Sequence, residues 1–182
     1  GPSDEAIFER FSQCLLSVAA EQPSRFVHRD YHSRNLMVLD EGEIAIIDFQ
    51  DAIVGPITYD AVSLLKDVYI VWPREQQMSW LEEYWHLLVS ADYLPDDSWG
   101  AFVRWYDLMG LQRHVKILGV FSRLWLRDQK PAYMRDIPVV IDYIREACGL
   151  YSEDYSAIAD FWKWFEGTVL PKVQQADWYA TS

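Results

Sequence analysis

The sequence is poor in the residues that build disulfide scaffolds, zinc sites, membrane spans and nucleic-acid-binding surfaces. Among 182 residues there are two cysteines, Cys14 and Cys148, and four histidines, without the spacing of zinc ligands. No run of about 18 apolar residues occurs, which argues against a membrane-spanning helix. Sixteen basic residues against 28 acidic ones give a net charge of −12, and no basic patch stands out. We therefore expect no membrane and no nucleic acid among the partners.

The first residues, GPSDEAIFERF, are polar and acidic and lack the features of a secretory signal. Gly1-Pro2-Ser3 resembles the remnant that a protease leaves after removal of an expression tag. We therefore set residues 1–3 aside and expect one domain over residues 4–182. Without a signal, the two cysteines are expected to be buried free thiols of a cytoplasmic protein.

Apolar residues are abundant, at 51% of the chain, and aromatic ones make up 15%, which excludes intrinsic disorder. Apolar positions spaced three and four residues apart predict a series of helices. The predicted helices cover residues 4–21, 57–70, 75–91, 99–127, 137–147 and 154–168. Two apolar runs, 36–39 and 43–47, flank Gly42 and predict a β-hairpin after a short extended run at 26–29. The expected fold class is α+β, mainly α, with a small hairpin.

Two polar stretches beside this hairpin carry the chemistry: HRDYHSRN (28–35) and IIDFQD (46–51). A hairpin that returns from Asn35 to Asp48 brings an amide and a carboxylate together, and these oxygens with phosphate oxygens suit Mg²⁺. Asp30 is then left to accept a proton from a hydroxyl. A single Asp in a loop is usually a turn or cap residue. The coincidence of the D-x-x-x-x-N spacing, the hairpin and the following Asp favours a catalytic site.

This pattern resembles the catalytic and metal-binding segments of the protein-kinase fold. The motifs HRDYHSRN, IDFQD and GPITYDAVSLL are similar to those of the aminoglycoside phosphotransferase and choline kinase superfamily. VHRDYHSRNLMV, IDFQDAIVGPITYD and MGLQRHVKILG (109–119) look closer still to one branch, the bacterial anomeric kinases of N-acetylmuramate and N-acetylglucosamine that serve cell-wall recycling. The resemblance runs from about residue 26 to residue 147.

The resemblance implies an ATP-dependent transfer of the γ-phosphoryl group to a sugar hydroxyl, with Mg²⁺. Asp30 would be the catalytic base, and Asn35 and Asp48 the metal ligands. His32 would support the loop, and Asp60 would brace the loop's backbone from the following helix. Asp51 would either contact metal or substrate or cap the next turn.

The nucleotide-binding lobe of that fold has no counterpart in the sequence. Only 29 residues precede Asp30, no G-x-G-x-x-G occurs, and no lysine precedes Lys66. We therefore expect a kinase-like C-terminal lobe whose nucleotide lobe is absent. Such a lobe should be nearly inactive alone, and its exposed interlobe surface should favour dimers.

Basic residues of the long predicted helix allow two interpretations. Arg113, Lys116 and Arg123 form either a solvated face or a cationic clamp for the carboxylate of an acidic sugar. Two other functions also stay open: an aminoglycoside or choline-type kinase, and a non-catalytic scaffold that keeps only the kinase-like lobe.

Overall fold

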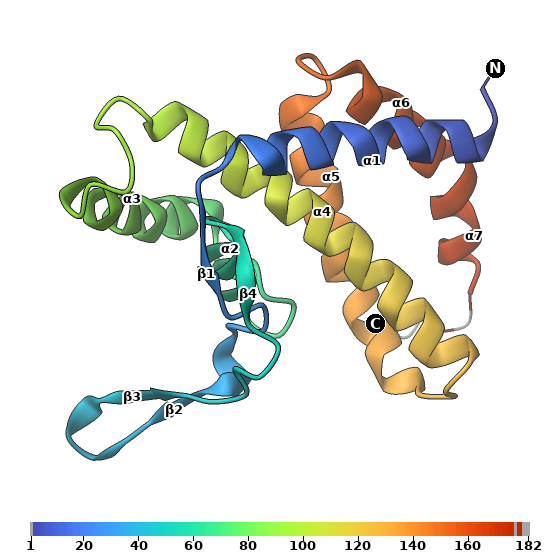
Figure 1. The fold of residues 1–182 in the computed structure, drawn as a ribbon. Coiled ribbons are helices and arrows are strands. Elements are labelled where there is room, and N and C mark those ends of the chain that lie inside the picture. Colours follow the sequence, from blue (N-terminus) through green and yellow to red (C-terminus); the bar gives the residue numbers. More distant parts are fainter. Residues whose placement is uncertain (1, 177, 180–182) are drawn as a thin grey trace. The chain divides into compact units, whose positions relative to one another are not determined.

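The computed structural model describes residues 2–176, 178 and 179, except for the side chain of Glu41. Helices dominate, and the strands form two small antiparallel pairs (Figure 1). The helices are α1 Asp4–Glu21, α2 Tyr59–Leu65, α3 Arg74–Ser90, α4 Trp99–Leu126, α5 Ile137–Tyr151, α6 Ser156–Trp164 and α7 Leu170–Gln174. The strands are β1 Ser24–Val27, β2 Leu36–Val38, β3 Ile44–Ile46 and β4 Ile53–Pro56. The predicted fold class, α+β and mainly α, is confirmed.

The chain divides into two compact units, and each is described by itself. One unit is Val18–Gly110, and the other joins Gly1–Ser17 to Leu111–Ser182. The boundaries expected from the sequence, 1–3 and 4–182, remain predictions. Gly1 and residues 177 and 180–182 lie outside the described part.

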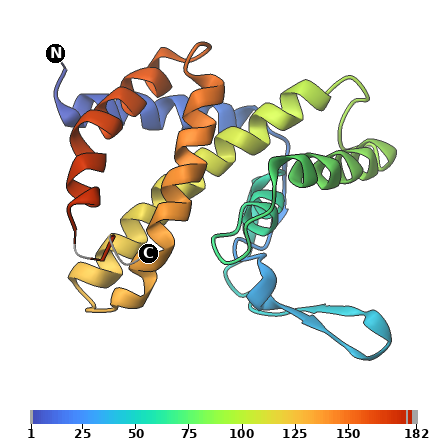
Figure 2. The ribbon, with the colours of Figure 1, turned by 180° about the vertical axis from the view of Figure 1, so that it is seen from behind.

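The unit Val18–Gly110 contains both strand pairs. The predicted hairpin is confirmed: β2 and β3 pair with Leu36 opposite Ile46 and Val38 opposite Ile44. Gly42 supplies the positive φ, +80°, that the turn requires. The hairpin projects away from the rest of its unit in both views (Figures 1 and 2).

Two further antiparallel strands, β1 and β4, meet at the base of the hairpin. Val27 lies opposite Ile53, and Ser24 lies opposite Pro56. The sequence predicted the extended run of β1 but not β4, because Gly55-Pro56 marks a turn in most sequences. This strand pair places the residues just before the polar stretch 28–35 beside those just after the polar stretch 46–51.

An apolar core between α2, α3 and the first half of α4 supports these strands. Its members are Ile57, Val62, Leu65, Leu81, Trp85, Leu88, Leu94, Phe102, Tyr106 and Met109. The two strand pairs are much less covered, since Val38 is 79% exposed and Val54 is 77% exposed.

In the unit formed by Gly1–Ser17 and Leu111–Ser182, helices pack through aromatic rings. Phe11 of α1 stacks on Phe161 of α6 at a centroid distance of 3.8 Å, and His114 of α4 stacks on Tyr143 of α5 at 4.4 Å. Burial raises the pKa of the Cys148 thiol to about 12. Both cysteines are free, but only Cys148 is fully buried; Cys14 is half-buried, contrary to expectation.

The predicted helices agree with the structure except in two places. The helix expected over 57–70 ends at Leu65, where Lys66 leaves the helical conformation; the Lys66 ammonium pairs with Asp107. The helix expected over 154–168 is α6 followed by a π-helical turn, Phe165–Val169, and α7 lies beyond the predicted range. Among the described residues, no helix is long and apolar enough to cross a membrane.

Candidate active site

Asp60, at the start of α2, forms hydrogen bonds with the backbone of the loop that follows β1. The carboxylate accepts the backbone N–H of His28 at 2.7 Å and that of Arg29 at 3.0 Å. Arg29 has a φ of 76°, a left-handed conformation that a long side chain rarely adopts. The two hydrogen bonds fix the backbone at this strained position, and the chain then presents the Asp30 side chain at the surface.

The buried imidazole of His28 links the loop to the end of the hairpin. Its Nε2 lies 3.0 Å from the carbonyl oxygen of Ile47, the residue before Asp48. The backbone N–H of Ile47 in turn donates to the carbonyl of Asn35 at 3.1 Å. The backbone at Asn35 therefore lies beside the residue that precedes Asp48.

The amide of Asn35 has a defined orientation. Its Nδ2 donates to the backbone carbonyl of Asp30 at 2.9 Å, at the end of a short 3-10 turn, Ser33–Asn35. That donation ties the two ends of the D-x-x-x-x-N segment together and leaves Oδ1 as the acceptor. Asp48 has a φ of 67°, which Asp tolerates better than most residues, and its exposed carboxylate accepts a hydrogen bond from Gln50.

The donor set of Asn35 and Asp48 fits a magnesium ion bound with a nucleotide. Mg²⁺ takes oxygen ligands, and it uses only one or two protein groups where phosphates and water supply the rest. Within the described residues, no cluster of three or more His, Cys, Asp or Glu side chains is arranged for a metal. The site thus lacks the fuller cage that a protein-only cation site needs.

His32 and Asp51 contact the loop that bears Asp30 and Asn35. The His32 ring meets the edge of Tyr69 at 6.3 Å, and the His32 carbonyl accepts the backbone N–H of Asn35 at 2.9 Å. Asp51 has an exposed side chain, and its carbonyl accepts Nη1 of Arg29 at 3.2 Å. Both residues therefore contact the loop, and their functional roles remain predictions.

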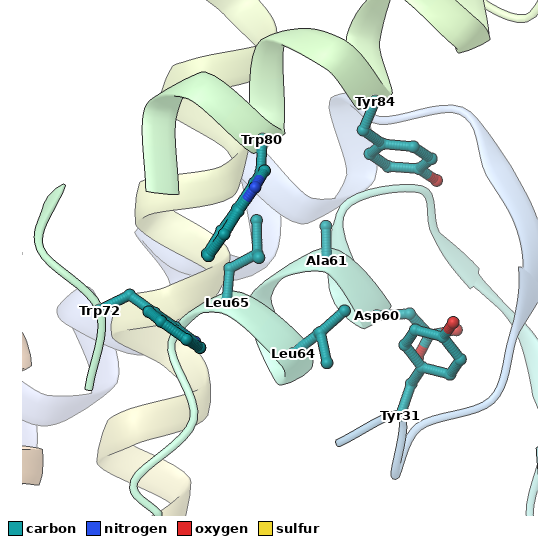
Figure 3. Close-up of a pocket in the computed structure, with 8 residues that line it drawn as sticks. All are labelled: Tyr31, Asp60, Ala61, Leu64, Leu65, Trp72, Trp80 and Tyr84. Atoms are coloured by element: carbon teal, nitrogen blue, oxygen red, sulfur yellow. The ribbon is translucent and has the colours of Figure 1, made fainter. Parts of the chain in front are cut away.

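A cavity of about 590 Å³ opens beside the loop, within the same unit. It is lined by Tyr31, Asp60, Ala61, Leu64, Leu65, Trp72, Trp80 and Tyr84. Figure 3 shows the two tryptophans at one end of the cavity and Tyr31 with Asp60 at the other. Burial, together with the Asp60 charge, raises the pKa of the Tyr84 hydroxyl above its ordinary value.

Sequence reasoning missed the aromatic residues of this cavity. Trp80 and Tyr84 belong to the apolar face of α3, and helical spacing alone does not separate a cavity wall from a core. Trp72 lies between the helices predicted over 57–70 and 75–91. One signal was available: Tyr31 directly follows Asp30, so its side chain had to lie near the proposed base.

The three candidate substrate-binding cations lie in the other compact unit. Lys116 and Arg123 are exposed on α4, and Arg113 is half-buried there. Their proposed contact with an acidic sugar remains a prediction.

Comparison with known proteins assigns the chain to a family. The pattern of the phosphotransferase enzyme family matches residues 2–99, more than half of the chain. Over 147 residues the chain is 42% identical to an N-acetylmuramate/N-acetylglucosamine kinase of Pseudomonas putida and 40% identical to one of Neisseria meningitidis. These matches cover 81% of this chain but only 43% and 44% of the relatives, so the chain spans less than half their length. The chain belongs to the phosphotransferase enzyme family.

Proposed function

We propose that this chain is the acceptor- and metal-binding part of an ATP-dependent sugar kinase. The acceptor is the anomeric hydroxyl of N-acetylmuramate or N-acetylglucosamine, and the reaction serves cell-wall recycling. The names and identities of the relatives support this acceptor. The observation that carries the proposal is the closed set of contacts that links the loop bearing Asp30 and Asn35 to the backbone before Asp48.

In the proposed reaction, the sugar hydroxyl oxygen bonds to the γ-phosphorus of ATP. The bond from that phosphorus to the bridging oxygen breaks, ADP leaves, and the hydroxyl proton passes to the Asp30 carboxylate. Asn35 Oδ1 and Asp48 would hold Mg²⁺, which neutralises phosphate charge when bound. Asp60 would keep the loop in its strained conformation, with His32 in support and Asp51 at the edge of the site.

The cavity beside Tyr31 is the proposed entrance for the sugar. Its volume lies in the range of small-molecule sites, roughly 300–1,000 Å³. The rings of Trp72, Trp80 and Tyr84 offer flat apolar faces for the C–H groups of a pyranose. Tyr31 lies on the cavity wall and next to Asp30 in the chain, which brings the acceptor close to the base.

One observation favours a second candidate, a choline- or aminoglycoside-type kinase. The Asp60 carboxylate lies in the wall of an aromatic cavity, and ammonium groups bind well to aromatic faces near a negative charge. A non-catalytic scaffold is disfavoured, because such a protein has no reason to keep Asp30, Asn35 and Asp48 together.

The nucleotide lobe would come from the part of the longer relatives that this chain does not span. We expect this chain alone to be nearly inactive, since phosphoryl transfer depends on positioning ATP. The exposed apolar residues of the strand pairs would be covered by that lobe or, in its absence, by a second copy of the chain. The free thiols suit a reducing compartment, and we assign the protein to the cytoplasm.

The test uses the full-length protein that contains this chain. ADP release is measured with N-acetylmuramate, N-acetylglucosamine, choline and an aminoglycoside as acceptors. Preferred turnover of the amino sugars supports the proposal, and preferred turnover of choline or the aminoglycoside replaces it with the second candidate. Absence of turnover with all four would leave only the scaffold.

Single substitutions then test the residue roles. Asp30→Asn should lower kcat by about 10²- to 10⁴-fold with little change in nucleotide affinity, because a base is lost while shape is kept. Asn35→Ala and Asp48→Asn should instead raise the Mg²⁺ concentration required. Asp92→Asn is the matched control, because Asp92 is another exposed Asp with positive φ, 57°. A kcat within a few-fold of wild type in Asp30→Asn would remove Asp30 as the base.

A further inference from the structure

A seven-residue segment, Asp67–Pro73, joins α2 to α3 and is fixed at both ends by one carboxylate, that of Asp107 in α4. Lys66, just before the segment, donates from Nζ to Asp107 Oδ1 at 2.9 Å. Arg74, just after it, donates from Nη1 to Oδ1 at 2.9 Å and from Nη2 to Oδ2 at 2.7 Å. We call these three residues the Asp107 clasp.

The clasp is buried to a degree that is unusual for charged groups. The side chains of Asp107 and Lys66 are 0% and 1% exposed. Burial alone would raise the pKa of Asp107, but the hydrogen bonds and charges of Arg74 and Lys66 outweigh it, so the pKa lies below its ordinary value. Gly110 leaves room for the lysine, because a Cβ there would lie 3.1 Å from Lys66 Cδ.

A buried ion cluster of this kind is a poor source of stability, since apolar residues of similar volume often do as well or better. What it supplies is geometry: a bidentate arginine and a lysine that converge on one carboxylate have few alternative arrangements. The segment between them is therefore held at a fixed span.

On one side, the segment contacts the turn that carries Asn35. The Arg34 guanidinium carbon lies 3.4 Å from the centroid of the Tyr69 ring, and Ser33 Oγ donates to Asp67 Oδ2 at 3.4 Å. Arg34 immediately precedes Asn35. On the other side, Trp72 lines the cavity and meets Trp80 edge to face at 5.0 Å.

We infer that Asp107 is a positioning residue for phosphoryl transfer: by holding both ends of Asp67–Pro73, it fixes the turn at Asn35 and the cavity wall at Trp72. The inference rests on the proposed function of that site. Asp107 is not among the residues that line the cavity, and in this inference it acts through the segment. Displacement of reacting groups by about 1 Å is enough to reduce a rate about 100-fold, so a loosened segment has a large kinetic effect.

The test compares Asp107→Asn and Tyr69→Leu in the full-length protein with wild type. Asp107→Asn removes the charge that both cations bind. Tyr69→Leu breaks the contacts of the Tyr69 ring with Arg34 and His32 while the clasp stays intact. Both should lower kcat/KM for the acceptor at least tenfold and raise the Mg²⁺ requirement, at a temperature where circular dichroism shows them folded. Asp160→Asn, which breaks the exposed pair of Arg10 and Asp160, is the matched control and should leave both parameters unchanged.

A second readout does not depend on activity. The ring of Tyr69 should shift the Arg34 Nε–H proton signal upfield, and Asp107→Asn should reduce that shift. An unchanged Arg34 signal in folded Asp107→Asn overturns the inference, as does unchanged kinetics in Tyr69→Leu. If Asp107→Asn fails to fold, Arg74→Gln, which removes one end of the clasp and keeps the pair of Lys66 and Asp107, takes its place in both measurements. A wild-type protein that phosphorylates no sugar refutes the proposed function, and the Arg34 signal then still decides whether Asp107 holds the turn.

Discussion

The two compact units differ in what fixes their backbones. In the unit formed by Gly1–Ser17 and Leu111–Ser182, helices pack through aromatic rings, as in the stack of Phe11 on Phe161. In Val18–Gly110, carboxylates fix segments that have no regular structure: half-buried Asp60 accepts two backbone N–H groups, and buried Asp107 pairs with two cations. Arg29 and Asp48, both with positive φ, also lie in the unit Val18–Gly110.

The two kinds of contact determine different features of the backbone. Apolar packing is non-directional and tolerates small adjustments, so it sets which helices pack together. Hydrogen bonds that a carboxylate accepts are directional, and they fix a loop at a particular backbone conformation. The candidate active site lies in the unit that contains these directional contacts, and four predictions test this contrast.

The largest effect is expected for Asp107→Ala. Removal of the carboxylate leaves the Lys66 ammonium buried without its main counter-charge, which should lower the free energy of unfolding by about 3–5 kcal/mol. Urea denaturation followed by circular dichroism measures the loss. A loss below about 1 kcal/mol would mean that water or another group solvates Lys66, and the contrast between the units would weaken.

Phe161→Ala in the helical unit should cost a similar free energy, about 3–5 kcal/mol, because a buried aromatic ring is lost. Its effect on chemistry should differ. At a temperature where the variant is folded, the kcat of the full-length protein should stay within about two-fold of wild type, whereas that of Asp107→Asn should fall. Equal kinetic losses in the two variants would contradict the contrast.

Acid should destabilise the unit Val18–Gly110 through protonation of Asp107. Because the pKa of Asp107 is lower in the folded state than its ordinary value of 3.8, its contribution is complete above about pH 4. The contribution is lost as the pH falls through the lowered folded-state pKa. Between about pH 4 and pH 2, the free energy of unfolding should therefore fall more steeply in wild type than in Asp107→Asn. Urea denaturation at several pH values measures both curves, and parallel curves would contradict this assignment.

The smallest effects are expected for substitutions of two glycines, which should change the free energy of unfolding in opposite directions. Gly119→Ala in α4 should raise the free energy of unfolding by about 0.5–1 kcal/mol, since the position is helical and nothing lies within 4 Å of an added Cβ. Gly42→Ala in the hairpin turn should lower it by about 1–2 kcal/mol, because φ is +80°. Thermal denaturation of the two variants beside wild type gives both signs in one experiment, and equal signs would refute the argument.

Much of the helical framework was predictable, because the apolar spacing of α1, α3 and α4 is a local property of the chain. The hairpin was predictable for the same reason, with Gly42 between two apolar runs. The end of α2 was not, since the apolar pattern continues to Ile70, while the Lys66 ammonium that follows Leu65 pairs with a residue 41 positions later. Strand β4 was not predicted either, because its partner β1 ends 26 residues before it begins.

The sequence by itself determined the fold class, the family resemblance and the identity of Asp30, Asn35 and Asp48 as candidates, since these depend on residue type and short spacing. Only the tertiary structure decided that the Asn35 amide is turned toward Asp30, that Trp72, Trp80 and Tyr84 line a cavity with Tyr31, and that Asp107 ties the ends of one segment. The physical reason is that side-chain orientation and buried charge pairing depend on groups far apart in the chain, and periodicity carries no information about such partners.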